Sequence, residues 1–574
     1  MAVRTEKWFV AGKRADFKAI GEKYGIDQVT ARIIRNRDIM DDAQIAAYLH
    51  PDLSHLHSPH LMKDMDRLAQ ILHQKILDQK RIRIIGDYDV DGVQSTYILL
   101  KGIRRAGGIV SAVIPDRMED GYGINRDLIA KAKDDGEDTI ITCDNGIAAI
   151  EAIAYGKELG MTILVTDHHD IPYQEEQGVR TYLKSSADAI VNPKQEECRY
   201  PFDGICGAAV AFKAVQALYE ECGIPQTEAM EFLENAAFAT VCDVMDLKDE
   251  NRILVKYGLE QMRHTNNKGL TALMHQKEVN PQSLSVYHLG FVLGPCLNAS
   301  GRLDHAYRSL NLLLAEEESD AVSLAAEITD LNDERKRMTE EGVNAALDLI
   351  REKRLDQDKV MMIYLPGLHE SLAGLVAGNI KEKYHRPVFV MTDSKEGVKG
   401  SGRSIEAYSM YEELCKCREV FLKFGGHPMA AGFTLLEGKV DTFVSQMNHN
   451  ATLTEEDLIP KVHIDVPMPL SYVTQHLIEE FKLLEPFGKG NAKPVFADKN
   501  IRVKDKRIVG KNQNVGKLTL EDAAGRRYPA VYFGDVLEFF GFLEQKDVIS
   551  IVYYPEINRY MGREEIQFVI SGYC

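Results

Sequence analysis

The sequence predicts a multidomain α/β protein with a parallel-sheet domain, a long connecting helix, a second α/β domain and a small C-terminal β-barrel. Three patterns predict it. Ile- and Val-rich runs alternate with helical stretches from Arg81 onward, which is typical of a parallel sheet. Residues 315–350 are rich in Ala, Glu, Leu and Arg and contain no proline, as in a long helix. Short alternating runs with glycine and charged turns follow Pro460, which indicates a small barrel.

The length of 574 residues predicts several domains, because a typical domain has about 100–150 residues. We expect an N-terminal segment (1–65), a parallel-sheet domain (66–312), a connecting helix (313–352), a second α/β domain (353–455) and a barrel domain (456–574). The helix would span roughly 50 Å at about 1.5 Å per residue. It either holds two domains apart or packs as an ordinary surface helix on one of them.

The first α/β domain contains five expected strands, separated by helical segments such as 93–105 and 148–159. These strands are residues 81–85, 109–114, 139–142, 162–165 and 189–191. Sites in parallel sheets form beyond the carboxyl ends of the strands, so the loops after these runs are where chemistry is expected. The later domains have expected strands at 360–364, 388–391, 495–503, 516–520, 528–533 and 548–554, and an expected helix at 371–384.

Composition constrains location more than function. The hydrophobic fraction is 45%, and no apolar run approaches the roughly 18 residues of a membrane helix, so we expect a soluble chain. Residues 1–7 lack the features of a secretory signal, which favours the cytoplasm. Nine cysteines without a Cys-x-x-Cys pair indicate reduced thiols and no structural zinc. The net charge of −18 argues against nucleic acid unless basic residues gather locally.

Three aspartates, Asp87, Asp89 and Asp91, lie between the first expected strand and a helix. Their mutual repulsion is costly unless a cation is present, and hard divalent ions such as Mg²⁺ or Mn²⁺ prefer oxygen ligands. An EF-hand calcium loop begins with the same pattern, but its twelfth position requires Glu, and this chain has Ile98 there. The EF-hand also requires a helix before the loop, where this chain has a strand. The aspartates are therefore candidate ligands of Mg²⁺ or Mn²⁺.

Further acids and histidines follow later strands. Asp144 follows the third expected strand, and His168 and His169 follow the fourth. A single Asp at a strand end is more often a helix N-cap than a ligand. Three successive loops at one edge of a sheet are not readily explained by capping, and imidazole combined with carboxylate suits Mn²⁺. Asp243 is a fourth candidate, and Asp246 is the weaker alternative to it.

Together these clusters resemble the DHH phosphoesterase superfamily, named for the motif that stands here as Asp167-His168-His169. Residues 294–303, 400–404 and 425–433 are similar to further blocks of the RecJ family of single-stranded-DNA-specific exonucleases. The resemblance extends from about Leu68 to the C-terminus. It implies the order DHH domain, long helix, DHHA1 domain and OB-like barrel.

The resemblance implies a two-metal phosphodiesterase that degrades single-stranded DNA in the 5′–3′ direction, releases 5′-mononucleotides and acts in DNA recombination and repair. Its cofactors would be two Mn²⁺ or Mg²⁺ ions. The expected metal ligands are Asp87, Asp89, Asp91, Asp144, His168 and Asp243, with Asp144 as the best candidate for a shared ligand. The expected catalytic residues are Asp89, Asp144, His168 and His169. Adjacent side chains on an extended segment diverge, so His169 is assigned to the scissile phosphate.

Arginines are expected to hold the substrate, because a planar guanidinium binds phosphate in a bidentate manner. The expected substrate-binding residues are Arg117, Tyr122, Asn298, Arg302, Ser401, Arg403 and His427. By resemblance, Arg117, Ser401 and Arg403 form a pocket for a 5′ phosphate. A surface salt bridge is the commoner role of any one arginine. Glycines beside Arg302 and Arg403 favour the functional interpretation, because they allow close approach of the backbone to a ligand.

Other residues leave two interpretations open. His427 fits a structural Gly/Pro turn as well as it fits a cleft, and His369 is a weaker candidate. Cys296 stands where the family often has Arg, which puts one substrate contact in doubt. Residues 499–507 are basic and continue to Lys511 and Lys517. They suit either a groove for a single strand, with Tyr528, Tyr532 or Phe533 as stacking faces, or a solvated hairpin.

Two other functions compete with this interpretation. One is a DHH/DHHA1 phosphoesterase that acts on oligoribonucleotides, pAp or cyclic dinucleotides. The other is a non-catalytic replication scaffold of the Cdc45-like type, although such relatives lose carboxylates that this chain retains. The expected partners are single-stranded DNA, a single-strand-binding protein and a helicase, with no membrane and with the chain as a monomer.

Overall fold

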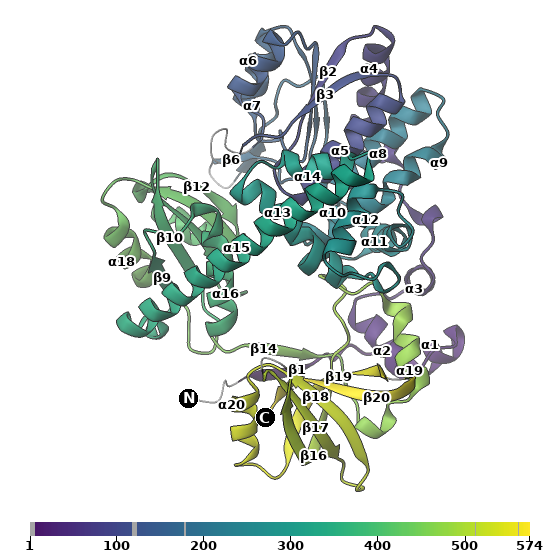
Figure 1. Ribbon diagram of the computed structural model, residues 1–574, viewed down its shortest axis with the longest axis vertical. Coiled ribbons are helices and arrows are strands. Elements are labelled where there is room, and N and C mark those ends of the chain that lie inside the picture. The colour runs from purple at the N-terminus through teal and green to yellow at the C-terminus, as the bar shows by residue number, and fades with distance from the viewer. Residues whose placement is uncertain (1–5, 117–122, 177–178, 511–512, 561) are drawn as a thin grey trace. The chain divides into compact units, whose positions relative to one another are not determined.

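The protein is described by a computed structural model that covers residues 6–116, 123–176, 179–510, 513–560 and 562–574 (Figure 1). The chain forms two compact units. One contains residues 56–458, and the other combines residues 1–55 with residues 459–574. Each unit is described by itself below.

The first unit contains a parallel five-stranded sheet in the order β3-β2-β4-β5-β8. Its strands are β2 (Arg81–Ile85), β3 (Ile109–Val113), β4 (Thr139–Cys143), β5 (Thr162–Thr166) and β8 (Ala189–Val191). Ile, Val and Thr dominate these strands because β-branched side chains pack well on a pleated surface that helices cover on both faces. The five expected strands are confirmed, and a hairpin of β6 (Tyr173–Glu176) and β7 (Val179–Tyr182) is additional.

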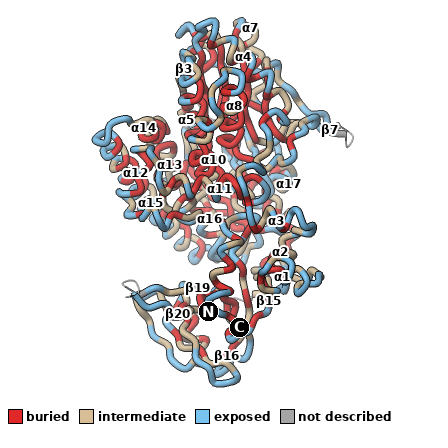
Figure 2. The backbone as a smooth tube through the Cα atoms, turned by 90° about the vertical axis from the view of Figure 1, so that its right-hand side faces the viewer, coloured by how far each residue is buried: buried red, intermediate tan, exposed pale blue. Residues whose placement is uncertain are grey.

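Helices cover both faces of this sheet (Figure 1). One face packs on α6 (Arg126–Asp134) and α7 (Ile150–Glu158), whose Ile129 and Ile153 are fully buried. The other face packs on α5 (Val90–Arg105) and α8 (Gly207–Glu221), which in turn contact α10 (Leu233–Cys242). Figure 2 shows the buried backbone concentrated in α5, α8 and α10.

A 36-residue helix, α15 (Glu318–Lys353), connects the two α/β domains of this unit. It would be about 54 Å long at about 1.5 Å per residue. Toward its N-terminus it packs against α12 (Lys268–Gln276), α13 (Gly294–Leu303) and α14 (Tyr307–Leu314) of the first α/β domain. Toward its C-terminus it packs against α16 (Ala373–Tyr384) and β9 (Met361–Tyr364). Of the two expectations for this helix, the structure therefore supports the connecting helix.

The second α/β domain has a five-stranded sheet in the order β12-β13-β11-β10-β9. The strands beyond β9 are β10 (Val388–Ser394), β11 (Gly397–Arg403), β12 (Phe421–His427) and β13 (Ala430–Leu435). The sequence predicted β9 and β10 but not the glycine-rich β11, β12 and β13. Glycine is needed on β11, because a Cβ at Gly400 would lie 2.2 Å from the Phe433 ring. Phe389, Phe421, Phe433 and Phe443 form the aromatic core under these strands.

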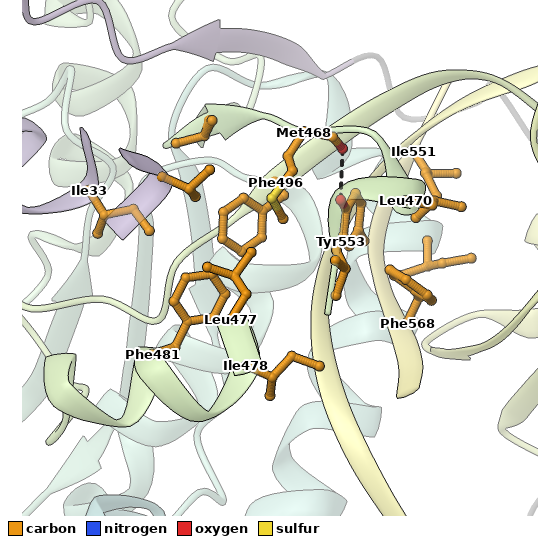
Figure 3. Close-up of a cluster of buried hydrophobic side chains, with 14 of the residues drawn as sticks. Ile33, Met468, Leu470, Leu477, Ile478, Phe481, Phe496, Ile551, Tyr553 and Phe568 are labelled. Atoms are coloured by element: carbon orange, nitrogen blue, oxygen red, sulfur yellow. Dashed lines mark hydrogen bonds between the residues drawn. The ribbon is translucent and has the colours of Figure 1, made fainter. Parts of the chain in front are cut away.

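The second unit contains a six-stranded sheet in the order β15-β16-β17-β18-β20-β19, and β19 also pairs with β16. These strands are β15 (Val466–Pro467), β16 (Phe496–Val509), β17 (Val515–Glu521), β18 (Arg527–Phe533), β19 (Ile549–Tyr560) and β20 (Arg563–Tyr573). The sequence predicted four of them and missed β15 and β20. In the core, the rings of Phe481 and Phe496 stack at 5.4 Å, and the Tyr553 hydroxyl donates to the Met468 carbonyl at 2.7 Å (Figure 3).

The N-terminal helices belong to this same unit. They are α1 (Phe17–Tyr24), α2 (Gln28–Asn36) and α3 (Asp42–Leu49). Ile33 of α2 is fully buried in the core that Figure 3 shows. Glu480 accepts a hydrogen bond from the Asp27 backbone at 2.9 Å, and β1 (Lys7–Val10) pairs with β14 (Lys461–Ile464). Within the described residues of both units, no helix combines the length and apolarity needed to cross a membrane.

We expect Ile33→Ala to destabilise the unit formed by residues 1–55 and 459–574 by about 2–5 kcal/mol, because it opens a cavity in a shared core. Hydrogen exchange of the slowest amides in β16 and β19 measures this loss. Met40→Ala is the matched control, because it also truncates an apolar side chain, but one that is 64% exposed. Equal protection in Ile33→Ala and Met40→Ala would contradict the packing described.

Candidate metal centre

Two of the three aspartates after β2 are fixed by backbone N–H groups. Asp89 is the N-cap of α5 and accepts from the Gly92 N–H at 3.0 Å. Asp91 lies in the first turn of the same helix and is 2% exposed. Its two carboxylate oxygens accept from the Gly207 and Ala208 N–H groups at 2.7 Å each. The N-terminus of α8 therefore holds Asp91 through the donors that a helix start leaves without internal partners.

Asp144 lies directly after β4 and adopts a left-handed backbone conformation with φ of 60°. Its neighbour Asn145 fixes this turn, because the Asn145 amide donates to the Ile85 carbonyl at 3.1 Å and to the Cys143 carbonyl at 2.9 Å. Asp144 is 2% exposed. A Cβ at Gly207 would lie 2.7 Å from the Asp144 Cβ, so the start of α8 approaches this residue as closely as glycine allows.

The motif after β5 forms a turn around the Asp167 side chain. Asp167 Oδ1 accepts from the His168 N–H at 2.7 Å, from the His169 N–H at 3.1 Å and from His169 Nδ1 at 2.8 Å. The rings of His168 and His169 therefore lie side by side, with centroids 4.5 Å apart. Our expectation that the two side chains diverge is wrong, because it assumed an extended segment where the chain turns.

His168 connects three of the acids. Its Nε2 lies 3.1 Å from an oxygen of Asp144, 3.5 Å from one of Asp91 and 3.7 Å from one of Asp243. Asp243 occupies the C-cap of α10. Asp246 pairs instead with Lys248 at 3.3 Å. The structure therefore brings Asp243 to the cluster and leaves Asp246 out of it.

The ligand atoms fall into three overlapping groups, and within each group they lie within 4.8 Å of one another. The groups are Asp144 with His168 and His169, Asp91 with His168 and Asp243, and Asp87 with Asp89 and Asp144. Mixed carboxylate oxygens and imidazole nitrogens suit Mn²⁺, and the carboxylates alone suit Mg²⁺. Asp144 and His168 each appear in two groups, so the arrangement fits more than one ion.

The electrostatics of the cluster agree with a cation site. Burial, together with the charges of Asp91 and its neighbours, raises the pKa of Asp144 well above its usual range. Burial also lowers the pKa of His168, which favours the neutral imidazole that binds metals. Burial opposes protonation of His169, but the hydrogen bond to Asp167 raises the pKa of that ring to about 9. A bound divalent ion would offset the repulsion that otherwise keeps a carboxyl protonated.

A cleft of about 540 Å³ lies between the two α/β domains of this unit. It is lined by Tyr88, Arg302, Glu370, Ser371, Gly374, Lys399, Gly400, Ser401, Arg403, Lys423, Phe424, Gly425, Gly432, Phe433 and Thr434. Arg302 donates to the Ser371 carbonyl at 3.0 Å, and Arg403 donates to the Ser401 hydroxyl at 3.0 Å. A Cβ at Gly374 would lie 2.6 Å from the Arg403 guanidinium, so glycine here leaves room for that side chain.

Other expected substrate residues lie in different surroundings. Asn298 accepts from the Val90 N–H at 3.2 Å, which joins α13 to the start of α5. The side chain of His427 is 64% exposed, lies 3.7 Å from Asp170 and does not line the cleft. His369 caps a short helix through Ser371. Arg117 and Tyr122 lie outside the described residues. Cys296 is fully buried and donates to the Val292 carbonyl at 3.2 Å.

Sequence reasoning missed several residues around these sites. Asp167 was used only as part of a motif, although it positions both histidines. Lys399 lines the cleft and pairs with Glu370 at 3.0 Å. A signal for it exists, since Lys399, Ser401 and Arg403 alternate on β11 and therefore share one face of the strand. This alternation identifies Lys399 only once the glycine-rich segment is recognised as a strand.

We expect Asp144→Asn to weaken Mn²⁺ binding more than about 100-fold, because removal of even an outer-shell partner typically costs about 10–100-fold. Calorimetry, or electron paramagnetic resonance of free Mn²⁺, measures the change. Asp170→Asn is the matched control, because Asp170 follows the same motif but its side chain is 65% exposed and pairs with Lys194. Unchanged Mn²⁺ binding in Asp144→Asn would contradict the site.

Comparison with known proteins identifies the parts of the chain. Family models match residues 81–240 as the DHH family, N-terminal domain, residues 357–452 as the DHHA1 domain and residues 464–572 as the RecJ OB domain. The fold is similar to the crystal structure of RecJ in complex with Mn²⁺ from Thermus thermophilus. The TM-score is 0.83 at 24% identity, over 99% of this chain and 79% of that one.

Curated relatives share more of the sequence. The single-stranded-DNA-specific exonuclease RecJ of Bacillus subtilis is 35% identical over 562 residues, which are 96% of this chain and 69% of that protein. The protein with the same name from Salmonella typhimurium is 30% identical over 589 residues, at 94% and 98%. With these relatives and three matching domain models in the same order, the chain belongs to the RecJ family of single-stranded-DNA-specific exonucleases.

Proposed function

We propose that this chain is a metal-dependent exonuclease that degrades single-stranded DNA from the 5′ end and releases 5′-mononucleotides. One observation carries the proposal: the acids and histidines at the ends of β2, β4 and β5 belong to the same compact unit as a cleft lined by Arg302 and Arg403. Metal ligands suit phosphoester chemistry, and guanidinium groups suit phosphates. Relatives named as single-stranded-DNA-specific exonucleases support the substrate.

Two Mn²⁺ or Mg²⁺ ions would be held by Asp87, Asp89, Asp91, Asp144, His168 and Asp243. Asp144 is the best candidate for a shared ligand, because its carboxylate belongs to one group with His168 and to another with Asp87 and Asp89. When bound, such ions polarise the phosphoryl group and lower the pKa of water, which supplies a nucleophile at neutral pH.

The residues of the chain then position the substrate. Asp167 accepts from Nδ1 of His169, so Nε2 is the ring nitrogen that would donate to the scissile phosphate. The same bond fixes the orientation of the ring, which matters because small displacements of a catalytic group are costly. Asp89, Asp144, His168 and His169 are the proposed catalytic residues.

Arg302, Ser401 and Arg403 would bind phosphates in the cleft. The hydrogen bond between Arg403 and Ser401 aligns a guanidinium with a hydroxyl, and both can donate to the same phosphate. Arg117 and Tyr122 join this set by family resemblance, and Asn298 supports the metal loop through Val90. A pocket that accepts only a terminal phosphate would impose 5′–3′ polarity. His427 would contact the strand outside the cleft.

The OB domain would bind single-stranded DNA through its own basic surface. Its long strand β16 carries the basic residues, although Lys504 pairs with Glu521 at 3.0 Å and Lys506 donates to the Phe540 carbonyl at 3.0 Å. Of the expected stacking residues, Tyr528 and Tyr532 pack partly into the core, whereas Phe533 is 60% exposed. Phe533 is therefore the better stacking face, since base stacking needs an open ring. Lys511 lies outside the described residues.

The alternative functions are less well supported. A non-catalytic scaffold does not need six candidate metal ligands in one cluster, and an enzyme for dinucleotides does not need an OB domain. We further propose that the working parts are the DHH domain (66–312), the connecting helix (313–352), the DHHA1 domain (353–455) and the OB domain (456–574), after a segment at 1–65. A monomer in the cytoplasm that acts in DNA recombination and repair, with a single-strand-binding protein and a helicase as partners, fits this activity.

We expect Arg403→Ala to lower kcat/KM about 10- to 100-fold on a strand with a 5′ phosphate, because a hydrogen bond to a charged group contributes about 1.5–3 kcal/mol. The loss should be much smaller on a strand with a 5′ hydroxyl. The assay uses 3′-labelled single strands with Mn²⁺, and Arg351→Ala on α15 is the control, since its side chain is 72% exposed. Equal loss on both strands, or digestion that begins at the 3′ end, would contradict the proposal.

A further inference from the structure

A second cavity lies in the DHH domain, apart from the metal centre. Its volume is about 630 Å³, which is within the range of about 300–1,000 Å³ for small-molecule sites. The cavity is bounded by α5, by residues 228–235, which lead into α10, and by residues 261–267 at the C-terminal end of α11 (Asp249–Met262). None of its lining residues belongs to the metal ligands or to the cleft described above.

One face of α5 supplies the positive charge. Tyr97, Lys101, Arg104 and Arg105 stand at i, i+4, i+7 and i+8, so they share this face. Arg105 binds Glu228 through two hydrogen bonds of 2.6 and 2.9 Å, which neutralises it. Lys101 and Arg104 make no ion pair with any residue that the structure describes, so two cations remain at the mouth of the cavity.

The interior is aromatic and rich in amides. Tyr97 and Phe232 pack edge to face at 6.4 Å, and the Asn267 amide donates to the Tyr97 hydroxyl at 3.2 Å. Glu234 accepts from the Thr265 hydroxyl at 2.7 Å, and its second oxygen has no partner among the described residues. Burial raises the pKa of Glu234 to about 7, so this carboxyl both donates and accepts near neutral pH. Aromatic rings beside such groups suit a heteroaromatic base.

The acids at the rim limit how much negative charge fits. Glu231 and Glu316 line the cavity and are exposed, and they oppose Lys101 and Arg104. A phosphate monoester carries a charge of about −1.5 to −2 at pH 7, and Lys101 and Arg104 can donate hydrogen bonds to its oxygens. A triphosphate or a DNA strand would bring more negative charge against the two glutamates. We infer that this cavity binds a nucleoside monophosphate, with its base against Tyr97 and Phe232 and its phosphate at Lys101 and Arg104.

The cavity is connected to the metal centre by two helices. Helix α5 carries Asp91 in its first turn and Lys101 about 15 Å further along its axis. Helix α10 begins beside the cavity and ends at the C-cap Asp243. The Asn235 amide, which lines the cavity, donates to the buried Gln94 of α5 at 2.7 Å and so joins the two helices. A ligand in the cavity therefore contacts both helices that deliver metal ligands, and its occupancy changes metal affinity.

This inference rests on the proposed function only in that the ligand belongs to the same chemical class as the product. Binding is therefore measured without catalysis, by calorimetry of the full chain with dAMP in EDTA. The test variant is Lys101→Ala/Arg104→Ala. The matched control is Lys131→Ala/Lys133→Ala, which removes two exposed lysines from α6 of the same domain. Deoxyadenosine, inorganic phosphate, dATP and spermidine are compared as ligands.

We expect one dAMP per wild-type chain, at least 10-fold weaker binding to Lys101→Ala/Arg104→Ala and unchanged binding to the control. Deoxyadenosine, phosphate and dATP should each bind more weakly than dAMP. Titration of Mn²⁺ with and without dAMP should show a shift in affinity that the test variant loses, because coupling between sites is reciprocal. Both double variants should keep the basal exonuclease activity.

Equal dAMP binding by wild type and Lys101→Ala/Arg104→Ala would overturn the inference. So would dAMP binding that requires Mn²⁺, because that places the nucleotide at the metal centre, or saturable binding of spermidine in preference to dAMP. An inactive wild-type protein that still binds dAMP in EDTA would overturn the proposed function and leave the cavity site intact. An active exonuclease that does not bind dAMP in EDTA would overturn the cavity site and leave the proposed function intact.

Discussion

Repulsion between buried carboxylates is the constraint on which the DHH domain depends. Asp87, Asp91 and Asp144 are each 2–3% exposed, so water cannot screen their charges from one another. Burial and these neighbouring charges raise the pKa of Asp144, which disfavours its ionised form when no cation is bound. The N-terminus of α8 offsets part of this cost at Asp91. Divalent ions supply the rest, and this is the physical reason why the site and its cofactors belong together.

Close contacts at glycine bring the supporting helices to these acids. A Cβ at Gly92 would lie 2.4 Å from the Asp87 carbonyl, and one at Gly301 would lie 2.3 Å from the Tyr88 carbonyl. With Gly207 against Asp144, three helices reach the metal loops at positions where any larger residue would force the backbone apart. Close packing of the main chain at these glycines therefore fixes where the candidate carboxylate ligands lie.

The elements that could be predicted from sequence have local signals. The five strands of the first sheet have β-branched runs, and candidate metal ligands follow β2, β4 and β5 as clusters of acids and histidines. The DHHA1 strands β11 and β12 lack such a local signal, because Gly400 and Gly425 stand where a strand usually has β-branched or aromatic side chains. The N-terminal helices join residues 459–574 through contacts such as Asp27 with Glu480, which no local pattern reveals. The turn at Asp167 was missed for a similar reason. The Asp167 side chain accepts hydrogen bonds from the following backbone N–H groups, and the sequence pattern does not show this.

The charge of −18 is compatible with a nucleic-acid substrate because four cationic side chains line one cleft. Lys399 and Lys423 are held by Glu370 and Glu396, so they contribute little net field. Arg302 and Arg403 donate to a carbonyl and a hydroxyl, and these bonds to neutral oxygens orient the guanidinium groups in the cleft. An acidic protein can therefore still attract phosphate locally, wherever its cations are gathered on one surface.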